Sequence, residues 1–150
     1  MKRFHFPLRP VAIVRADREM RAREALAAAL RARRLAEEEL AAAQGRVGEL
    51  AGVIAAGRVG SYRGADQANF LRAYRCECAL AAEKAKQLAA AQAEAAARRD
   101  ACIEANRQLK VVTRLEDKAR AAHRAELLRL EQQLIDESAG YGALRRRLSP

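Results

Sequence analysis

Apolar residues recur every three or four positions along the first third of the chain, which is the spacing of one face of an α-helix. The series approaches a cluster of glycines, and ten of its thirteen members are apolar. They are Ala12, Arg15, Glu19, Ala22, Leu26, Ala29, Arg33, Ala36, Leu40, Ala43, Val47, Leu50 and Ile54. Such a heptad repeat predicts a coiled-coil seam, in which alanine lets a partner helix approach closely.

A second series occupies the other half of the chain and predicts a second, longer helix. Its first part is Leu71, Tyr74, Cys78, Ala81, Ala85, Leu88, Gln92, Ala95, Arg99 and Cys102. The pattern then predicts a shift of phase, which locally rewinds a coiled coil, through Ala105, Leu109 and Val112. A later stripe contains Leu127, Leu130, Leu134, Tyr141, Leu144 and Leu148.

Six of the eight glycines fall between Gly45 and Gly64, and they mark the one strong break between the two series. Ser61 and Asp66 are candidate N-caps for the helix that follows. We therefore predict one domain over 1–150: a helix at about 7–56, a hinge at about 57–65, a helix at about 66–138 and a short tail at 139–150. The fold class is all-α, a long antiparallel two-helix coiled-coil hairpin whose second helix is the longer.

In such a hairpin, position n faces roughly position 120 minus n, so the chain after Val112 extends beyond the first helix. Leu127, Leu130 and Leu134 then form an apolar stripe that nothing in the chain covers. An uncovered stripe marks an interaction site or an oligomer seam, with a fraying tail as the alternative. Self-association through this stripe is left open.

Composition supports long helices over a globular core. Of 150 residues 51% are hydrophobic, but 37 of these are alanine, and Phe, Tyr and Trp together supply only 4%. The net charge is +10, which indicates an anionic partner surface. Residues 1–34 carry ten positive and three negative charges and residues 98–130 nine and five, whereas residues 35–97 carry seven and eight. The hairpin would gather both basic clusters at its open end.

The sequence offers no candidate catalytic site, metal site, cofactor site or small-molecule substrate site. His5 and His123 have no nucleophile beside them, and Cys76 and Cys78 point about 200° apart on a helix, so they cannot hold one ion. The glycines follow no strand and form no phosphate-binding loop. No apolar run is long enough to span a membrane, no signal peptide is evident, and an odd cysteine count indicates a reduced, cytosolic setting.

Both ends of the chain resemble the flagellar export protein FliJ family. The family's opening Phe-x-Phe-x-Leu element, followed by an aliphatic turn and a charged helix, corresponds to Phe4, Phe6, Leu8, Val11, Val14, Arg15, Arg18 and Glu19. Its C-terminal pattern corresponds to Lys110, Val111, Val112, Leu115, Lys118, Arg124, Glu131, Gln132, Ile135, Asp136 and Glu137. Thr113 and His123 depart from that pattern, where an acidic residue and an aromatic residue are usual.

The resemblance implies a non-enzymatic stalk of the flagellar type III protein export apparatus, similar to the central stalk of rotary ATPases. Its expected partners are the hexameric export ATPase FliI, which the open end enters, the export gate protein FlhA, and export chaperones. The expected location is cytoplasmic, at the inner membrane below the flagellum. The residues expected to contact the ATPase ring are Phe4, Phe6, Arg15, Arg18, Lys110, Arg114, Gln132, Asp136 and Glu137.

Two alternatives remain open at this point. One is the counterpart stalk of a virulence-type injectisome, with nearly the same fold and mechanism. The other is a basic-helix nucleic-acid-binding coiled coil, because the arginine-rich stretch 15–34 precedes heptads at Leu40, Val47 and Leu50. Asp17, Glu19 and Glu24 interrupt the basic face and glycines interrupt the zipper, so nucleic acid is not the expected partner.

Overall fold

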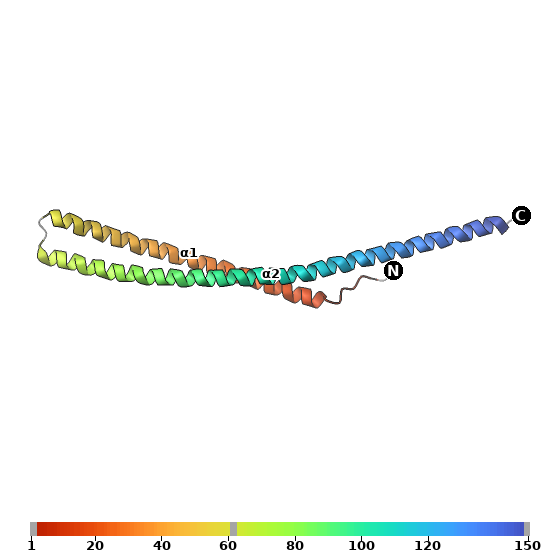
Figure 1. Ribbon diagram of the computed structural model, residues 1–150, viewed down its shortest axis with the longest axis horizontal. Coiled ribbons are helices and arrows are strands. Elements are labelled where there is room, and N and C mark those ends of the chain that lie inside the picture. Colours follow the sequence, from red (N-terminus) through yellow and green to blue (C-terminus); the bar gives the residue numbers. More distant parts are fainter. Residues whose placement is uncertain (1–2, 61–62, 149–150) are drawn as a thin grey trace. The chain divides into compact units, whose positions relative to one another are not determined.

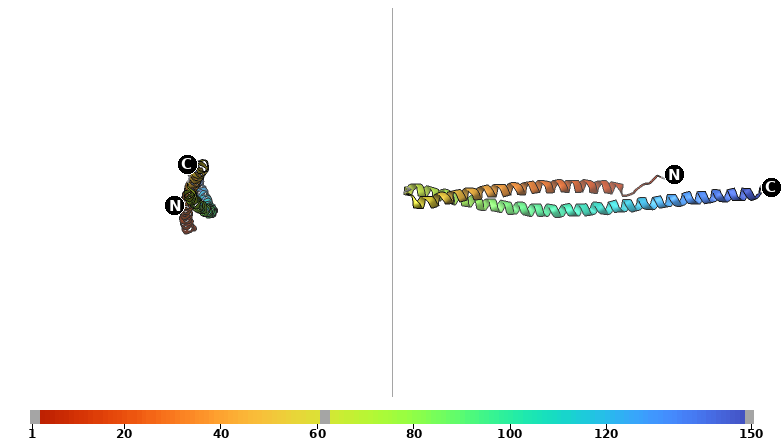
Figure 2. Two further views of the ribbon diagram at one scale, coloured as in Figure 1. Left: turned by 90° about the vertical axis from the view of Figure 1, so that its left-hand side faces the viewer. Right: turned by 90° about the horizontal axis from the view of Figure 1, so that it is seen from above.

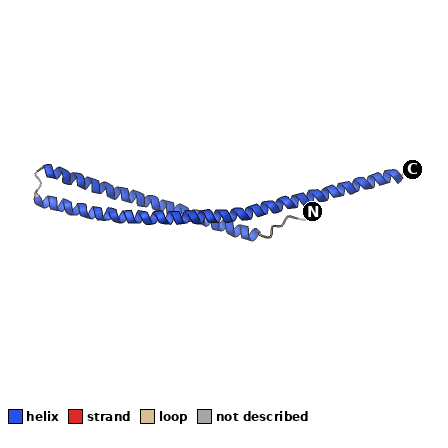
Figure 3. Cartoon of the chain, viewed as in Figure 1, coloured by secondary structure: helices blue, strands red, loops and turns tan. Residues whose placement is uncertain are grey.

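The computed structural model describes residues 3–60 and 63–148, with the side chains of residues 58, 59 and 141–148 left out. Over these residues the chain forms two helices and no strand (Figures 1 and 3). Helix α1 spans Arg9–Val59, 51 residues, and α2 spans Gly64–Leu148, 85 residues. The two helices pack against each other, which confirms the predicted all-α class and the longer second helix.

Each helix contributes to two compact units. The hinge unit is Glu19–Glu104, which contains most of α1 and the first part of α2. The terminal unit consists of Met1–Arg18 and Ala105–Pro150, so it contains the start of α1 and the remainder of α2. Each unit has its own set of contacts between the helices and is described by itself below.

Ion pairs across the hinge unit fix the antiparallel register of its helices. Lys84 Nζ lies 2.6 Å from Glu39 Oε2, and Arg46 Nε lies 3.0 Å from Glu77 Oε2. Both pairs of residue numbers add to 123, so position n faces position 123 minus n rather than the predicted 120 minus n. The difference follows from the helix bounds, because α1 ends at Val59 and α2 begins at Gly64, and these two numbers also add to 123. Figure 2 shows the two helices of the hinge unit side by side.

The predicted seam of α1 is confirmed throughout. All thirteen predicted positions are buried or half-buried, and Ala43 is fully enclosed at 0% exposure. Alanine predominates here because it has no side chain beyond Cβ to hold the helices apart. Ala29 on α1 and Ala95 on α2 are also buried, and their numbers add to 124, which places each within one residue of the position that faces the other.

Nine of the thirteen predicted seam positions of α2, Cys78 among them, are buried or half-buried, but the predicted phase shift is wrong. The heptad positions Tyr74, Ala81, Leu88, Ala95 and Cys102 are buried or half-buried as expected. The alternate positions lie one residue earlier than predicted, so Leu71, Ala85, Gln92 and Arg99 are exposed. The buried or half-buried residues of that second set are Phe70, Glu77, Lys84 and Ala91 and, at the same seven-residue spacing, Ala105, Val112 and Ala119.

The error has a physical cause, because the true seam contains charged residues. Glu77 and Lys84 occupy seam positions, and each is paired with a charge on α1. A charged side chain can occupy a partly buried position when a partner of opposite sign satisfies it. Selecting Cys78 over Glu77 and Ala85 over Lys84, the more apolar residue of each pair, displaces the predicted seam by one position there.

The helix ends differ modestly from prediction. Helix α2 begins at Gly64, and the backbone N–H groups of Asp66 and Gln67 donate to the carbonyl of Arg63. Asp66 therefore lies inside the first turn rather than at the N-cap, where its carboxylate still complements the positive end of the helix dipole. Ser61, the other candidate cap, lies outside the described residues.

At the other end, α2 continues to Leu148, ten residues beyond the predicted end at Ser138, so the expected tail is helical. Alanine, leucine and arginine favour helix there, and no proline precedes Pro150 to interrupt it. Within the described residues, neither helix has a stretch long and apolar enough to cross a membrane.

Candidate functional site: the basic terminal unit

The excess positive charge of the chain is concentrated in the terminal unit. Its two segments, residues 1–18 and 105–150, hold 15 Lys and Arg against seven Asp and Glu, a net charge of +8. The hinge unit, although larger, holds 14 against 12, a net of +2. A field of one sign attracts and orients an oppositely charged partner, so the terminal unit is the candidate binding surface.

The two phenylalanines of the N-terminal segment are packed onto this unit. Phe6 is 7% exposed, and the Phe4 ring lies edge-on to His123 with 5.5 Å between ring centroids. The guanidinium of Arg120 sits 5.6 Å from the centre of the Phe4 ring, within cation–π range. Phe4 thus contacts α2 directly, and Phe6, which is buried, presents little surface to a partner.

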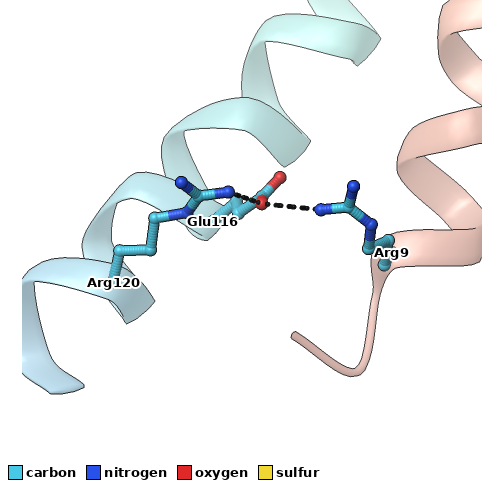
Figure 4. Close-up of polar contacts among 3 residues, drawn as sticks. All are labelled: Arg9, Glu116 and Arg120. Atoms are coloured by element: carbon cyan, nitrogen blue, oxygen red, sulfur yellow. Dashed lines mark hydrogen bonds and ion pairs between the residues drawn. The ribbon is translucent and has the colours of Figure 1, made fainter. Parts of the chain in front are cut away.

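Glu116 joins the two helices of the terminal unit through a pair of arginines (Figure 4). Its Oε1 atom accepts hydrogen bonds from Arg120 Nη2 at 2.7 Å and from Arg9 Nη1 at 3.5 Å. The Glu116 side chain is 17% exposed, whereas that of Arg9 is 66% exposed. One half-buried carboxylate therefore holds the first turn of α1 against α2. The sequence prediction missed Glu116, although its seam spacing from Leu109 could have revealed it.

The four predicted cationic contacts divide into two groups. Arg15 lies on the seam, half-buried, and its Nη1 donates to the carbonyl oxygen of Gln108 at 2.9 Å. Arg18, Lys110 and Arg114 are exposed. Arg15 therefore has a structural role in this unit, and the other three present their charge to solvent.

The predicted residues near the end of α2 are all exposed. Gln132 Nε2 donates to Asp136 Oδ1 at 2.9 Å along the helix, and Glu137 is exposed beside them. This hydrogen bond is one turn long and lies within α2, so both side chains stay on the surface.

The predicted apolar stripe is exposed over most of its length. Leu130 is 46% exposed and Leu134 66% exposed, whereas Leu127 is half-buried. The prediction missed two further residues, Leu128 at 66% and Ile135 at 58%, which each follow a predicted member in sequence. The part of this surface formed by Tyr141, Leu144 and Leu148 falls where side chains are not described.

The described residues contain no group of three or more His, Cys, Asp or Glu side chains that could hold a metal ion. Cys76 is exposed, and Cys78 and Cys102 are half-buried, all as free thiols. A hydrogen bond with Cys78, reinforced by charge on that thiol, raises the pKa of Tyr74 above its ordinary value. This pair lies in the hinge unit, away from the charged surface in sequence.

The fold and this surface define a class of protein: an antiparallel helical pair with one strongly basic unit that carries exposed leucines. A family model described as the flagellar FliJ protein matches residues 4–148, nearly the whole chain. The chain therefore belongs to the flagellar FliJ family, and it is a component related to flagellar export. Searches of curated proteins and of solved structures each gave no significant match.

Proposed function

We propose that this chain is a non-enzymatic coupling stalk of the flagellar export apparatus, whose terminal unit binds the hexameric export ATPase. The observation that carries the proposal is the net charge of +8 on the terminal unit, beside exposed leucines, in a member of the FliJ family. Membership of the flagellar family favours this function over the injectisome counterpart. The export gate protein and export chaperones are proposed as further partners, and the proposed location is the cytoplasmic face of the inner membrane at the flagellar base.

The exposed cations are the proposed contacts. Arg18, Lys110 and Arg114 face solvent, so they are available to carboxylates or backbone carbonyls of a partner. Single exposed ion pairs contribute only about 0–1 kcal/mol, so binding has to use several of them and weaken as salt rises. Phe4 and Arg15 contribute indirectly, because both contact α2, and Phe6 is buried rather than exposed to a partner.

The test is co-elution of the full chain with its cognate export ATPase at low salt, together with the rate of ATP hydrolysis. We expect a complex and altered hydrolysis for the unmodified chain. Combined Arg18→Glu and Arg114→Glu substitutions should weaken binding about tenfold or more, since each reverses one exposed contact. A matched control reverses two exposed arginines of the hinge unit, Arg72→Glu and Arg75→Glu.

The control separates a specific surface from a general effect of charge. We expect the hinge-unit variant to bind within about twofold of the unmodified chain, because bulk charge alone acts mainly through long-range steering. Equal losses in both variants, or no complex and unchanged hydrolysis with the unmodified chain, would count against the proposal. A gel shift with duplex DNA at matched salt tests the nucleic-acid alternative, for which we expect no band.

A further inference from the structure

The α2 segment that follows His123 carries an exposed apolar surface. The charged residues beside this surface are placed so that two antiparallel copies of the segment would be complementary. Phe4 reaches as far along α2 as His123, with which it makes a ring contact. Beyond that point Leu130 and Leu134 are 46% and 66% exposed, and they form one seam with the half-buried Leu127 at spacings of three and four residues. A seam of this kind on a single helix is half of a helix–helix interface.

Charged residues flank this seam in a definite order. Arg124 and Glu131 are both exposed, lie seven residues apart and therefore occupy the same heptad position on one side of the seam. Glu126, also exposed, lies on the other side. The side that carries Arg124 and Glu131 thus has a positive charge before Leu127 and a negative charge after Leu130.

That order decides how two copies of the segment can pair. In an antiparallel pair crossing near residues 128 and 129, Leu127 of each copy faces Leu130 of the other. The same register sets Arg124 of each copy against Glu131 of the other, so both flanking contacts are attractive. In a parallel pair, Glu126 of one copy would instead approach Glu131 of the other, which is repulsive.

We propose that a second copy of this chain docks antiparallel on the 124–134 segment of α2, through Leu127 and Leu130 of each copy and two Arg124–Glu131 contacts. The interface is isologous, because each copy contributes the same patch. It is short, so the dimer forms weakly and only at high protein concentration. The inference does not depend on binding of the export ATPase, because it concerns the purified chain alone.

Sedimentation equilibrium of the full chain over a range of concentrations tests the proposal. We expect a reversible monomer–dimer equilibrium. Arg124→Glu alone and Glu131→Arg alone should each raise the dimer dissociation constant about tenfold, since each creates two like-charged contacts. Leu130→Ser should abolish the dimer, and circular dichroism of each variant checks that helix content is unchanged.

Charge exchange distinguishes this register from any other. The double variant with both substitutions should dimerise like the unmodified chain, because the contacts become attractive again. An equimolar mixture of the two single variants should form a heterodimer more tightly than either forms a homodimer. A chain that stays monomeric at all concentrations, or a double variant as weak as the single ones, would overturn the proposal. A monomeric chain that still co-elutes with the export ATPase would assign the leucines to that partner instead.

Discussion

The hinge unit and the terminal unit share the same heptad repeat but differ in how much of its apolar face is covered. In the hinge unit both helices supply a seam in which alanine recurs, and the cross-helix ion pairs Glu39–Lys84 and Arg46–Glu77 satisfy the seam charges of Lys84 and Glu77. In the terminal unit the seam of α2 continues past His123, which contacts Phe4, through exposed leucines. In the hinge unit the apolar faces of the two helices cover each other. In the terminal unit part of the apolar face of α2 stays exposed.

The charges of the two units show the same contrast. A net charge of +2 over Glu19–Glu104 leaves little field for a partner, whereas +8 over the terminal unit repels itself and attracts anions. The comparison separates the hinge unit, where the helices pack closely, from the terminal unit, which carries the proposed binding surface. Substitutions should therefore affect stability most in the hinge unit and binding most in the terminal unit.

The largest effect on stability is expected where the helices approach most closely. Ala43 is 0% exposed at the seam of the hinge unit. Ala43→Leu should lower the free energy of unfolding by about 1–3 kcal/mol, because the larger side chain forces the helices apart. Thermal and urea unfolding followed by circular dichroism at 222 nm, a wavelength that reports helix content in general, measure the change.

The neighbouring alanine supplies a matched control. Ala42 is exposed, so Ala42→Leu makes the same chemical change outside the seam and should alter stability by less than about 0.5 kcal/mol. Leu128→Ser, at a 66% exposed position of the terminal unit, should be similarly mild. If Ala42→Leu were as damaging as Ala43→Leu, the assigned seam would be incorrect.

A stabilising change of nearly the same size is expected in the glycine-rich part of α1. Gly45 and Gly48 lie within the helix, and an added Cβ at either position would meet nothing within 4 Å. Gly45→Ala and Gly48→Ala should each raise stability by about 0.5–1 kcal/mol, since alanine loses less backbone entropy on folding.

The melting temperature of the double glycine variant measures this gain. The reverse change at an exposed alanine, Ala42→Gly, is the control and should lower the melting temperature by a comparable amount. An unchanged or lower melting temperature in the Gly45→Ala, Gly48→Ala double variant would mean that these glycines adopt a conformation other than this helix.

A smaller effect is expected from the ion pair between Lys84 and Glu39. The two side chains are 27% and 41% exposed, so solvent screening reduces their interaction. Lys84→Glu sets two carboxylates together and should lower stability by about 0.5–1 kcal/mol, less so at high salt. The exchange of both residues, Glu39→Lys with Lys84→Glu, should restore most of the loss in urea unfolding. A double variant no more stable than Lys84→Glu alone would place these residues out of contact.

Much of this fold could be read from the sequence, because a coiled coil is a local repeat. The α1 seam was predicted completely from the three- and four-residue spacing of positions such as Ala29 and Ala43. The α2 seam was predicted only in part, because Glu77 and Lys84 look like surface residues until their partners on α1 are known. Pairing across helices is information that a single helix does not contain.

The candidate site shows the same limit. Net charge and the exposed leucines Leu130 and Leu134 follow from composition and register, which the sequence provides. The roles of Phe6 and Arg15 could not be predicted in this way. The burial of Phe6 and the hydrogen bond from Arg15 to Gln108 both depend on tertiary contacts. Family resemblance selects both residues, but only the structure shows that they hold the unit together.

The smallest effect concerns Tyr74, where the two helices of the hinge unit approach the turn. The hydrogen bond with Cys78 and the charge of its thiolate raise the pKa of the Tyr74 phenol. Cys78→Ala removes both causes, so the pKa should fall toward the ordinary value of about 10. Absorbance of the phenolate against pH measures it, in a background where Tyr62 and Tyr141 are replaced by Phe. Because Cys78→Ser keeps a hydrogen-bonding group but has no thiolate, it should give an intermediate pKa. The same pKa in all three proteins would mean that Tyr74 and Cys78 do not interact, and that this part of the hinge unit is packed more loosely than its ion-paired centre.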